Sequence, residues 1–196
     1  MNGPDKKVFA KNYDWNLGHG YLVTNKRNVQ KNAIMLKATQ VPLQWTSKFA
    51  SVTFNQYGQE FPNSGMNEKG LAIEILWLDQ SVYPTADTRP EINELQWVQF
   101  HLDNYSSTAE LVSNVDKVRM NPVFAKVHYL VCDSTGECAT IEYQNGKLVT
   151  HTAEKLRPRL LTNSFYSESR DSLKPYMGFG GTKEIPEGTA SLERFA

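Results

Sequence analysis

The residues of this chain that are able to do chemistry gather in a few short stretches. The first, KNYDW, places Lys11, Asn12, Asp14 and Trp15 close to the start of the sequence. Residues near a terminus usually fray unless something holds them, so a dense polar cluster here requires an explanation. Taken singly, Asp14 and Asn12 are able to end a strand or form an Asx turn, and Lys11 is most simply a solvated charge.

The cysteines and histidines do not form a recognisable reactive cluster. Cys132 and Cys138 are separated by a turn-like stretch and flanked by apolar residues. The favoured interpretation is two strand residues packed as small hydrophobes, and a disulfide across the hairpin is the alternative, less favoured without a sign of secretion. The four histidines are His19, His101, His128 and His151. Their spacing is not that of metal ligands, so we expect no metal site.

Composition narrows the class of protein. The 196 residues are 40% hydrophobic, which fits one domain spanning 1–196 or a piece of a larger one. The 21 basic and 21 acidic residues cancel, so we expect neither nucleic acid nor a membrane surface as a partner. The first residues are polar and resemble no signal peptide. As read, the protein is cytoplasmic; it would be periplasmic or secreted if a signal peptide preceded this sequence.

The first ninety residues are rich in β-branched and aromatic residues between turn formers, a pattern typical of strands. Residues 63–70 are interpreted as a turn. They lead into residues 71–78, whose nearly continuous apolar sequence predicts a strand buried on both faces.

Two helices are expected next. Residues 89–105 carry apolar side chains at helical spacing: Ile92, Leu95, Val98 and Leu102. Residues 106–118 begin with a capping box, in which Ser107 is followed three positions later by Glu110.

Strands are expected to resume at residues 126–133, 138–144 and 147–153. Asn145 and Gly146 predict a tight hairpin turn between the last two. The stretch from Ser167 onward is expected to be loop-like, because it is rich in glycine. Strands, helices and strands in this order predict an α+β protein with a mostly antiparallel sheet and helices on a face.

Four motifs in this order carry a resemblance: KNYDW, GMNEKGLAIEILWL, LTNSFY and ERFA. The set resembles the choloylglycine hydrolase family, which includes bile salt hydrolases and penicillin V acylases, over nearly the whole chain. The resemblance implies the fold of N-terminal nucleophile hydrolases, a four-layer αββα sandwich, here incomplete. It also implies hydrolysis of linear amide bonds in small molecules such as penicillin V, conjugated bile salts, N-acyl amino acids or acyl homoserine lactones. No cofactor is implied. Dimers and tetramers are known in the family, so the resemblance is compatible with a homo-oligomer, but the sequence does not give the oligomeric state.

The resemblance further implies roles for individual residues. Asp14 would orient the α-amino group of the nucleophile, since a carboxylate only accepts hydrogen bonds. Lys11, where the family more often has arginine, would favour the thiolate with its charge, although it lacks the planar guanidinium fork. Asn163 would donate its amide N–H to the developing oxyanion, and Arg194 would support the nucleophile electrostatically.

Trp77 stands where bile salt hydrolases often have asparagine and penicillin acylases often have tyrosine. Its indole offers one N–H donor and a larger apolar wall, which favours a smaller aromatic or fatty acyl group over a bile salt. Simpler interpretations exist for each residue: Trp77 as core, Asn163 as a turn residue and Arg194 as an exposed residue.

The nucleophile itself is absent from this sequence. The family uses an N-terminal cysteine whose free α-amino group helps to move the proton. Residues 8–15 correspond to the family's second strand, so the cysteine would precede Met1, and neither Cys132 nor Cys138 can replace it. We therefore expect a domain truncated at both ends. The alternatives are a non-catalytic ligand-binding protein and an inactive truncated member of the same fold, with an unpaired sheet edge.

Overall fold

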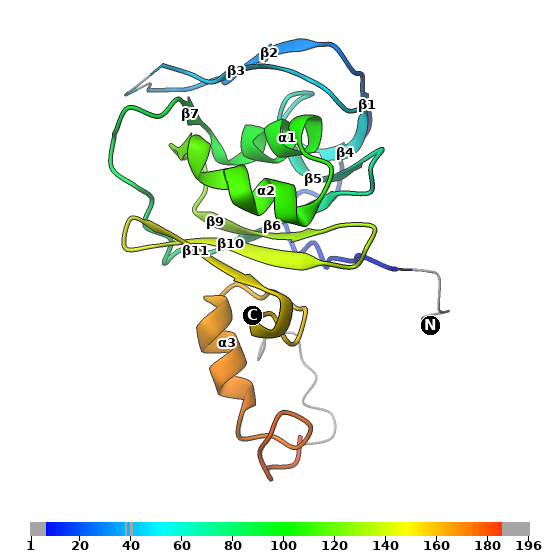
Figure 1. Ribbon diagram of the computed structural model, residues 1–196, viewed down its shortest axis with the longest axis vertical. Coiled ribbons are helices and arrows are strands. Elements are labelled where there is room, and N and C mark those ends of the chain that lie inside the picture. Colours follow the sequence, from blue (N-terminus) through cyan, green and yellow to red (C-terminus); the bar gives the residue numbers. More distant parts are fainter. Residues whose placement is uncertain (1–6, 38, 40, 186–196) are drawn as a thin grey trace.

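A large antiparallel sheet is the main feature of the computed structural model, which describes residues 7–37, 39 and 41–185 (Figure 1). Within those residues seven strands pair side by side, and every neighbouring pair is antiparallel. In spatial order they are β1 (Tyr21–Asn25), β4 (Ser51–Asn55), β5 (Pro62–Asn67), β6 (Ala72–Trp77), β9 (Val127–Cys132), β10 (Cys138–Gln144) and β11 (Lys147–Thr152). The expected mostly antiparallel sheet is confirmed.

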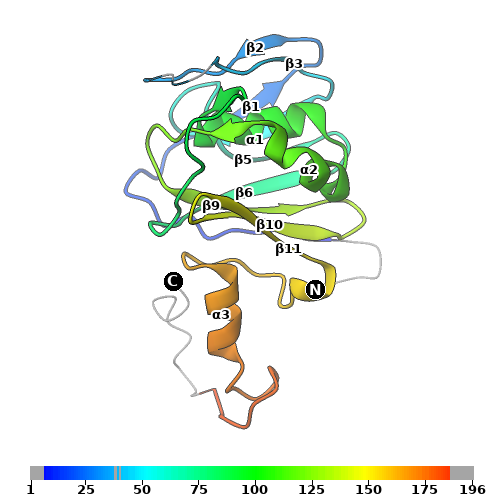
Figure 2. The ribbon, with the colours of Figure 1, turned by 60° about the vertical axis from the view of Figure 1, so that its left-hand side comes forward.

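Helices lie on both sides of this sheet. α1 (Glu94–Asn104) and α2 (Thr108–Asn114) cover one face, and α3 (Tyr166–Leu173) lies beyond the other face (Figures 1 and 2). Single 3-10 turns follow α2 and β11, at Val115–Lys117 and Ala153–Lys155. No helix in the described part of the chain is long and apolar enough to cross a membrane.

α1 is shorter than the predicted helix because its first residues join a small sheet. β7 (Glu91–Ile92) pairs in parallel with β8 (Arg119–Met120), so the helix begins only at Glu94. The side chain of Asn93 caps it by accepting from the N–H groups of Leu95 and Gln96. The prediction of a helix here is confirmed, and its boundary is corrected.

α1 is buried along its whole length. The large sheet packs on one side of it, and the hairpin of β2 (Gln30–Asn32) and β3 (Gln44–Thr46) lies across the other (Figure 2). Polar side chains of the helix therefore bond to the hairpin: Asp103 accepts from the indole of Trp45 at 2.7 Å and pairs with Lys31 at 3.0 Å.

The capping box predicted for α2 is present in a shifted form. The hydroxyl of Ser107 accepts from the backbone N–H of Glu110 at 3.2 Å. The carboxylate of Glu110, however, accepts from the N–H and hydroxyl of Ser106, each at 2.8 Å, rather than from the N–H of Ser107. The N–H groups of Glu110 and Ser106 are thereby satisfied at the start of α2.

Alternation along the central strands divides the core in two. In β9 and β10, Tyr129, Val131, Ile141 and Tyr143 belong to the cluster beneath α1 and α2. Leu130 belongs to a smaller cluster on the opposite face, together with Cys138, Leu156, Leu161 and Tyr166. We call this opposite side the second face of the sheet; it carries the candidate site described below.

Two expectations for the first seventy residues are wrong. Residues 8–15 form no strand in the described structure. No strand in the described part of the chain pairs with this segment, so side chains hold it instead: the ammonium of Lys7 donates to Ser134 O at 2.7 Å, and Phe9 packs on the second-face cluster. The turn predicted at 63–70 is confined to its last residues, because β5 continues to Asn67.

Two further corrections concern the second half of the chain. The stretch from Ser167 contains α3 rather than a loop, and its sequence gave no helical period because Tyr166 is its one buried residue. Cys132 and Cys138 form a disulfide rather than packing as free thiols. They occupy directly opposed positions of β9 and β10, with Cα atoms 4.1 Å apart, so the hairpin brings them together.

Candidate active site

Lys11 reaches from the N-terminal segment to β6, a central strand of the sheet. Its ammonium donates to Ile75 O at 2.7 Å and lies 3.4 Å from the carboxylate of Glu74. It also lies 4.8 Å from the centre of the Tyr13 ring, within cation–π range. The Lys11 and Glu74 side chains are 15% and 16% exposed, so this is a mostly buried ion pair. A solvated lysine is therefore the wrong interpretation of Lys11.

Burial shifts both members of this pair toward their neutral forms. Desolvation lowers the pKa of Lys11, and the charge of Glu74 opposes that shift. Desolvation likewise raises the pKa of Glu74, against the charge of Lys11 and a hydrogen bond from Ser64. The site thus contains an acid and a base whose proton affinities approach one another.

Asp14 is exposed, and its two neighbours hold its backbone in place. On one side, the hydroxyl of Tyr13 donates to Gln56 at 2.5 Å and accepts from the amide of Asn63 at 2.9 Å. Burial raises the pKa of Tyr13 to about 12. On the other side of Asp14, the ring of Trp15 stacks on that of Trp77. Asp14 is therefore an exposed residue between two neighbours whose side chains contact the rest of the protein.

Trp77 lies at the end of β6 and is half-exposed rather than core. Its ring stacks on Trp15, with centroids 5.9 Å apart and planes inclined by 28°. Its indole N–H donates to the carboxylate of Asp79. The two indoles together present a solvent-facing aromatic surface next to Asp14.

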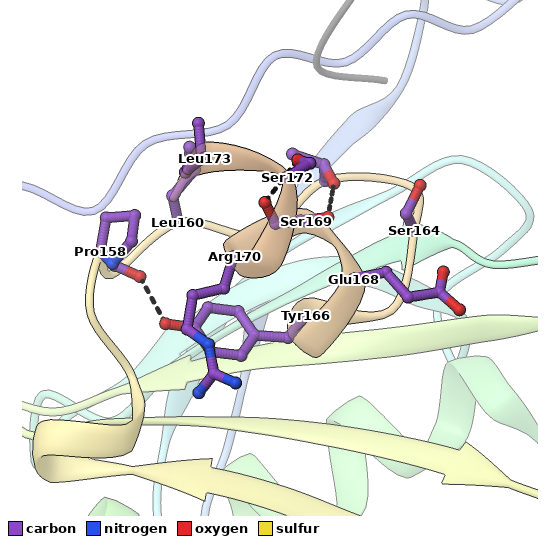
Figure 3. A pocket seen from close by; sticks show the side chains of 10 residues that line it. Pro158, Leu160, Ser164, Tyr166, Glu168, Ser169, Arg170, Ser172 and Leu173 are labelled. Atoms are coloured by element: carbon purple, nitrogen blue, oxygen red, sulfur yellow. Dashed lines mark hydrogen bonds between the residues drawn. The ribbon is translucent and has the colours of Figure 1, made fainter. Parts of the chain in front are cut away.

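Asn163 lies in the loop between the Ala153–Lys155 turn and α3, with its side chain exposed. The loop and helix enclose a pocket of 250 Å³, in which Leu160, Tyr166 and Leu173 give apolar walls (Figure 3). Two hydrogen bonds join residues that line the pocket: the Tyr166 hydroxyl donates to Pro158 O at 3.1 Å, and the hydroxyls of Thr162 and Ser169 lie 2.8 Å apart.

The second face of the sheet connects these segments. Phe9, Leu76 and Leu161 all join its apolar cluster, and each lies within two residues of Lys11, Trp77 or Asn163. Lys11, Asp14 and Trp77 are brought together by direct contacts of their own segments. Within the described residues no hydrogen bond, ion pair or ring contact links Asn163 to them. Arg194 lies outside the described residues.

Sequence reasoning missed two residues of this site. Glu74 is the one ionisable side chain within the apolar stretch 71–78, a signal that a buried partner was needed. Trp15 follows Asp14 directly, but only the fold brings it against Trp77.

What the arrangement offers is a cation in a mostly buried pair, an exposed carboxylate, an aromatic surface and an amide on a separate loop. Within the described part of the chain no group of three or more histidine, cysteine or acidic residues is placed to hold a metal ion. Both cysteines of the sequence are bonded to each other. The described residues therefore contain no free thiol.

The chain is similar to known amide hydrolases. Residues 2–184 match the family described as linear amide C–N hydrolases, choloylglycine hydrolase family. A penicillin V acylase of Pectobacterium atrosepticum is 33% identical over 99% of this chain and 55% of its own length. This chain thus spans about half the length of that relative.

Solved structures give the same result. The penicillin V acylase of Agrobacterium tumefaciens matches 88% of this chain and 53% of its own, with a TM-score of 0.69 and 30% identity. A conjugated bile acid hydrolase of Clostridium perfringens matches 81% of this chain and 50% of its own, with a TM-score of 0.65 and 17% identity. At this identity the match supports a shared fold only. The expected α+β fold of N-terminal nucleophile hydrolase type is confirmed, with one large sheet and its helices among the described residues.

Proposed function

Because the chain belongs to the choloylglycine hydrolase family of linear amide C–N hydrolases, we propose that it is part of an acylase acting on N-acyl amines. Residues 1–196 would form one partial domain of that enzyme. The observation that carries the proposal is the gathering of Lys11, Asp14 and the Trp15–Trp77 pair at one end of β6.

The proposed nucleophile is an N-terminal cysteine outside these 196 residues. Its thiolate attacks the amide carbonyl, and its α-ammonium group protonates the departing amine. Water then hydrolyses the thioester, which releases the acid and regenerates the thiol. Cys132 and Cys138 are unsuited to this step, because their sulfur atoms are bonded to each other and they lack a free α-amino group.

Four residues of this chain would serve that reaction. Asp14 holds the α-amino group of the cysteine, and Lys11 stabilises the thiolate by its charge. Asn163 donates to the oxyanion of the tetrahedral intermediate, where the loss of one donor typically costs 10²- to 10³-fold in rate. Arg194 adds positive charge.

The acyl side of the substrate would lie against Trp15 and Trp77. Both side chains are partly exposed, at 43% and 39%, so their ring faces are available to a ligand. Indole faces favour aromatic groups, whose stacking adds about 0.5–1.5 kcal/mol to the burial of apolar area. An aryl-acyl amide such as penicillin V therefore fits this surface better than a conjugated bile salt does.

The test is hydrolysis of penicillin V by a form of the protein that begins with the cysteine. We expect activity, a kcat lower by at least about 100-fold in Asn163→Ala, and a raised KM in Trp77→Ala. Arg159→Gln is the loop control, because Arg159 is exposed and its side chain makes no hydrogen bond or ion pair within the described residues; it should keep most of the activity. Full activity in Asn163→Ala would reject the oxyanion role.

One observation favours a second function for the 196-residue chain taken alone. Its two cysteines are joined, so it offers no thiolate. In that form we propose that it binds an aryl-acyl ligand without cleaving it. Quenching of tryptophan fluorescence by phenoxyacetate, reduced in Trp77→Ala, would support this function. An unchanged spectrum at millimolar phenoxyacetate would contradict it.

A further inference from the structure

A buried carboxylate beneath α3 has no part in the reaction proposed above. Glu142 lies in β10 on the second face of the sheet and is 0% exposed. A charge buried this deeply is costly unless it is paired and hydrogen-bonded, so its partners show what it does.

One partner of Glu142 is the start of α3. The backbone N–H of Tyr166, the first residue of the helix, donates to the carboxylate at 2.8 Å. The first N–H groups of a helix have no acceptor inside it, and Phe165, at the capping position, makes no side-chain cap. Glu142 therefore supplies from the sheet the cap that the local sequence lacks, and its charge also suits the positive end of the helix.

The other partners hold the carboxylate in place. His128, itself 0% exposed, has Nδ1 at 3.1 Å from the same oxygen. On the other oxygen, His151 Nδ1 lies at 3.8 Å and the amide of Gln144 donates at 3.4 Å. The ring of His151 also packs on that of Tyr166, with centroids 4.8 Å apart. Strands on both sides of β10 thus contribute to a single attachment point.

This attachment fixes the segment that carries Asn163. Leu161 and Tyr166 are both buried in the second-face cluster, and Asn163 lies between them. The Tyr166 hydroxyl donates to Pro158 O, which ties the start of the same loop to the helix (Figure 3). A loop held at both ends presents its middle residue in a narrow range of positions.

We propose that Glu142 is a positioning residue, which fixes α3 and thereby the placement of Asn163. The importance of this placement rests on the oxyanion role proposed for Asn163, whereas the attachment itself does not. The two claims are therefore separable by experiment.

Hydrogen exchange at the Tyr166 amide, measured by NMR on the 196-residue chain, is the direct test. In the native chain we expect this N–H to be protected, although it lies in the first turn of a helix. Glu142→Gln keeps an acceptor oxygen and should retain most of the protection. Glu142→Met fills the volume without an acceptor and should speed the exchange by at least about ten-fold.

Two controls separate this role from general loosening. Amides of α1 should exchange at native rates in both variants. Glu137→Gln, on the exposed turn of the same hairpin, should leave the exchange of Tyr166 unchanged. Native-like protection in Glu142→Met would overturn the proposal. So would a Tyr166 amide in the native chain that exchanges as fast as that of Ser167, a result that needs no variant to fold.

Activity then tests the consequence. In the cysteine-bearing form, Glu142→Met should lower kcat with little change in KM, whereas Glu142→Gln should restore most of it. Asn163→Ala should abolish most activity and leave the exchange of Tyr166 unaltered. Normal exchange effects with full activity in Asn163→Ala would reject the oxyanion role of Asn163 and leave the attachment by Glu142 standing.

Discussion

Replacing the partner of Lys11 should destabilise the protein in a pH-dependent way. Glu74→Leu removes the carboxylate 3.4 Å from the ammonium and leaves that charge mostly buried beside Ile75 O. Lys11→Met removes the ammonium and leaves the carboxylate of Glu74 mostly buried without its partner. Changing both residues removes both charges, so the double variant should be more stable than either single variant.

The size of the effect follows from the geometry. Two unit charges 3.4 Å apart attract by about 1.2 kcal/mol in bulk water and about 5 kcal/mol at an effective dielectric constant of 20. The Lys11 and Glu74 side chains are 15% and 16% exposed, which places the pair between these limits. We therefore expect a coupling free energy of about 2 kcal/mol from the double-mutant cycle.

The direction of the pH dependence differs between the two single variants. In Glu74→Leu the pKa of Lys11, already lowered by burial, loses the neighbour that raised it. Stability should then be lowest below that folded-state pKa and rise with pH through it toward 10.5. In Lys11→Met, Glu74 keeps a pKa raised by burial. Its contribution is fully present below pH 4.5 and is lost as the pH rises through the folded-state pKa.

Urea unfolding followed by far-UV circular dichroism at pH 7 and pH 9.5 measures both effects. The exposed Glu154–Arg157 pair, at 2.9 Å, is the matched control and should couple by less than about 0.5 kcal/mol. A Lys11–Glu74 coupling as small as that of the control would refute the account of a mostly buried pair.

Three further changes test the fold. Cys138→Ser removes the hairpin disulfide and should lower the free energy of unfolding by about 2 kcal/mol in urea, without loss of native circular dichroism; an unchanged midpoint would contradict this. Gly65→Ala places a Cβ 2.7 Å from Val52 O and should lower the free energy of unfolding by about 2 kcal/mol, measured as a lower Tm. A loss below about 0.5 kcal/mol would mean that β4 and β5 move apart to admit the methyl group. Glu94→Gln weakens three hydrogen bonds from the N–H groups of residues 123–125 and should speed their hydrogen exchange by about ten-fold; native rates there would show that the carboxylate does not hold that loop.

The elements with strong local signals could be predicted from the sequence. Asn145 and Gly146 both adopt positive φ, 51° and 77°, as a two-residue hairpin turn requires, and the strands on either side pair in register. The apolar spacing of residues 89–105 likewise identified α1. In each case the residues that decide the structure are neighbours in the chain.

The wrong predictions concern segments whose structure depends on contacts with residues distant in the sequence. α3 contains one buried side chain, and its cap comes from Glu142 in another element, so no local pattern marks it. The segment 8–15 was predicted to be a strand, but in the described structure it contacts β6 through the side chains of Lys11 and Trp15 and pairs with no strand. A cross-strand disulfide depends on a register that spacing alone does not fix.

The candidate site likewise contains residues that the sequence motifs identified and residues that only the fold revealed. Motif order pointed to Lys11, Asp14, Asn163, Arg194 and Trp77 through a family resemblance, and their roles remain proposals. The residues that touch them, Glu74 beside Lys11 and Trp15 against Trp77, became visible only when the N-terminal segment was placed along β6.

The most direct test of the central claim is the N-terminal residue of the protein purified from its natural source. Intact mass before and after iodoacetamide treatment, combined with a penicillin V assay, would measure it. We expect a chain that begins with a cysteine upstream of Met1, and activity that is lost when that one thiol is alkylated. A chain that begins at Met1 and still hydrolyses penicillin V after alkylation would contradict it.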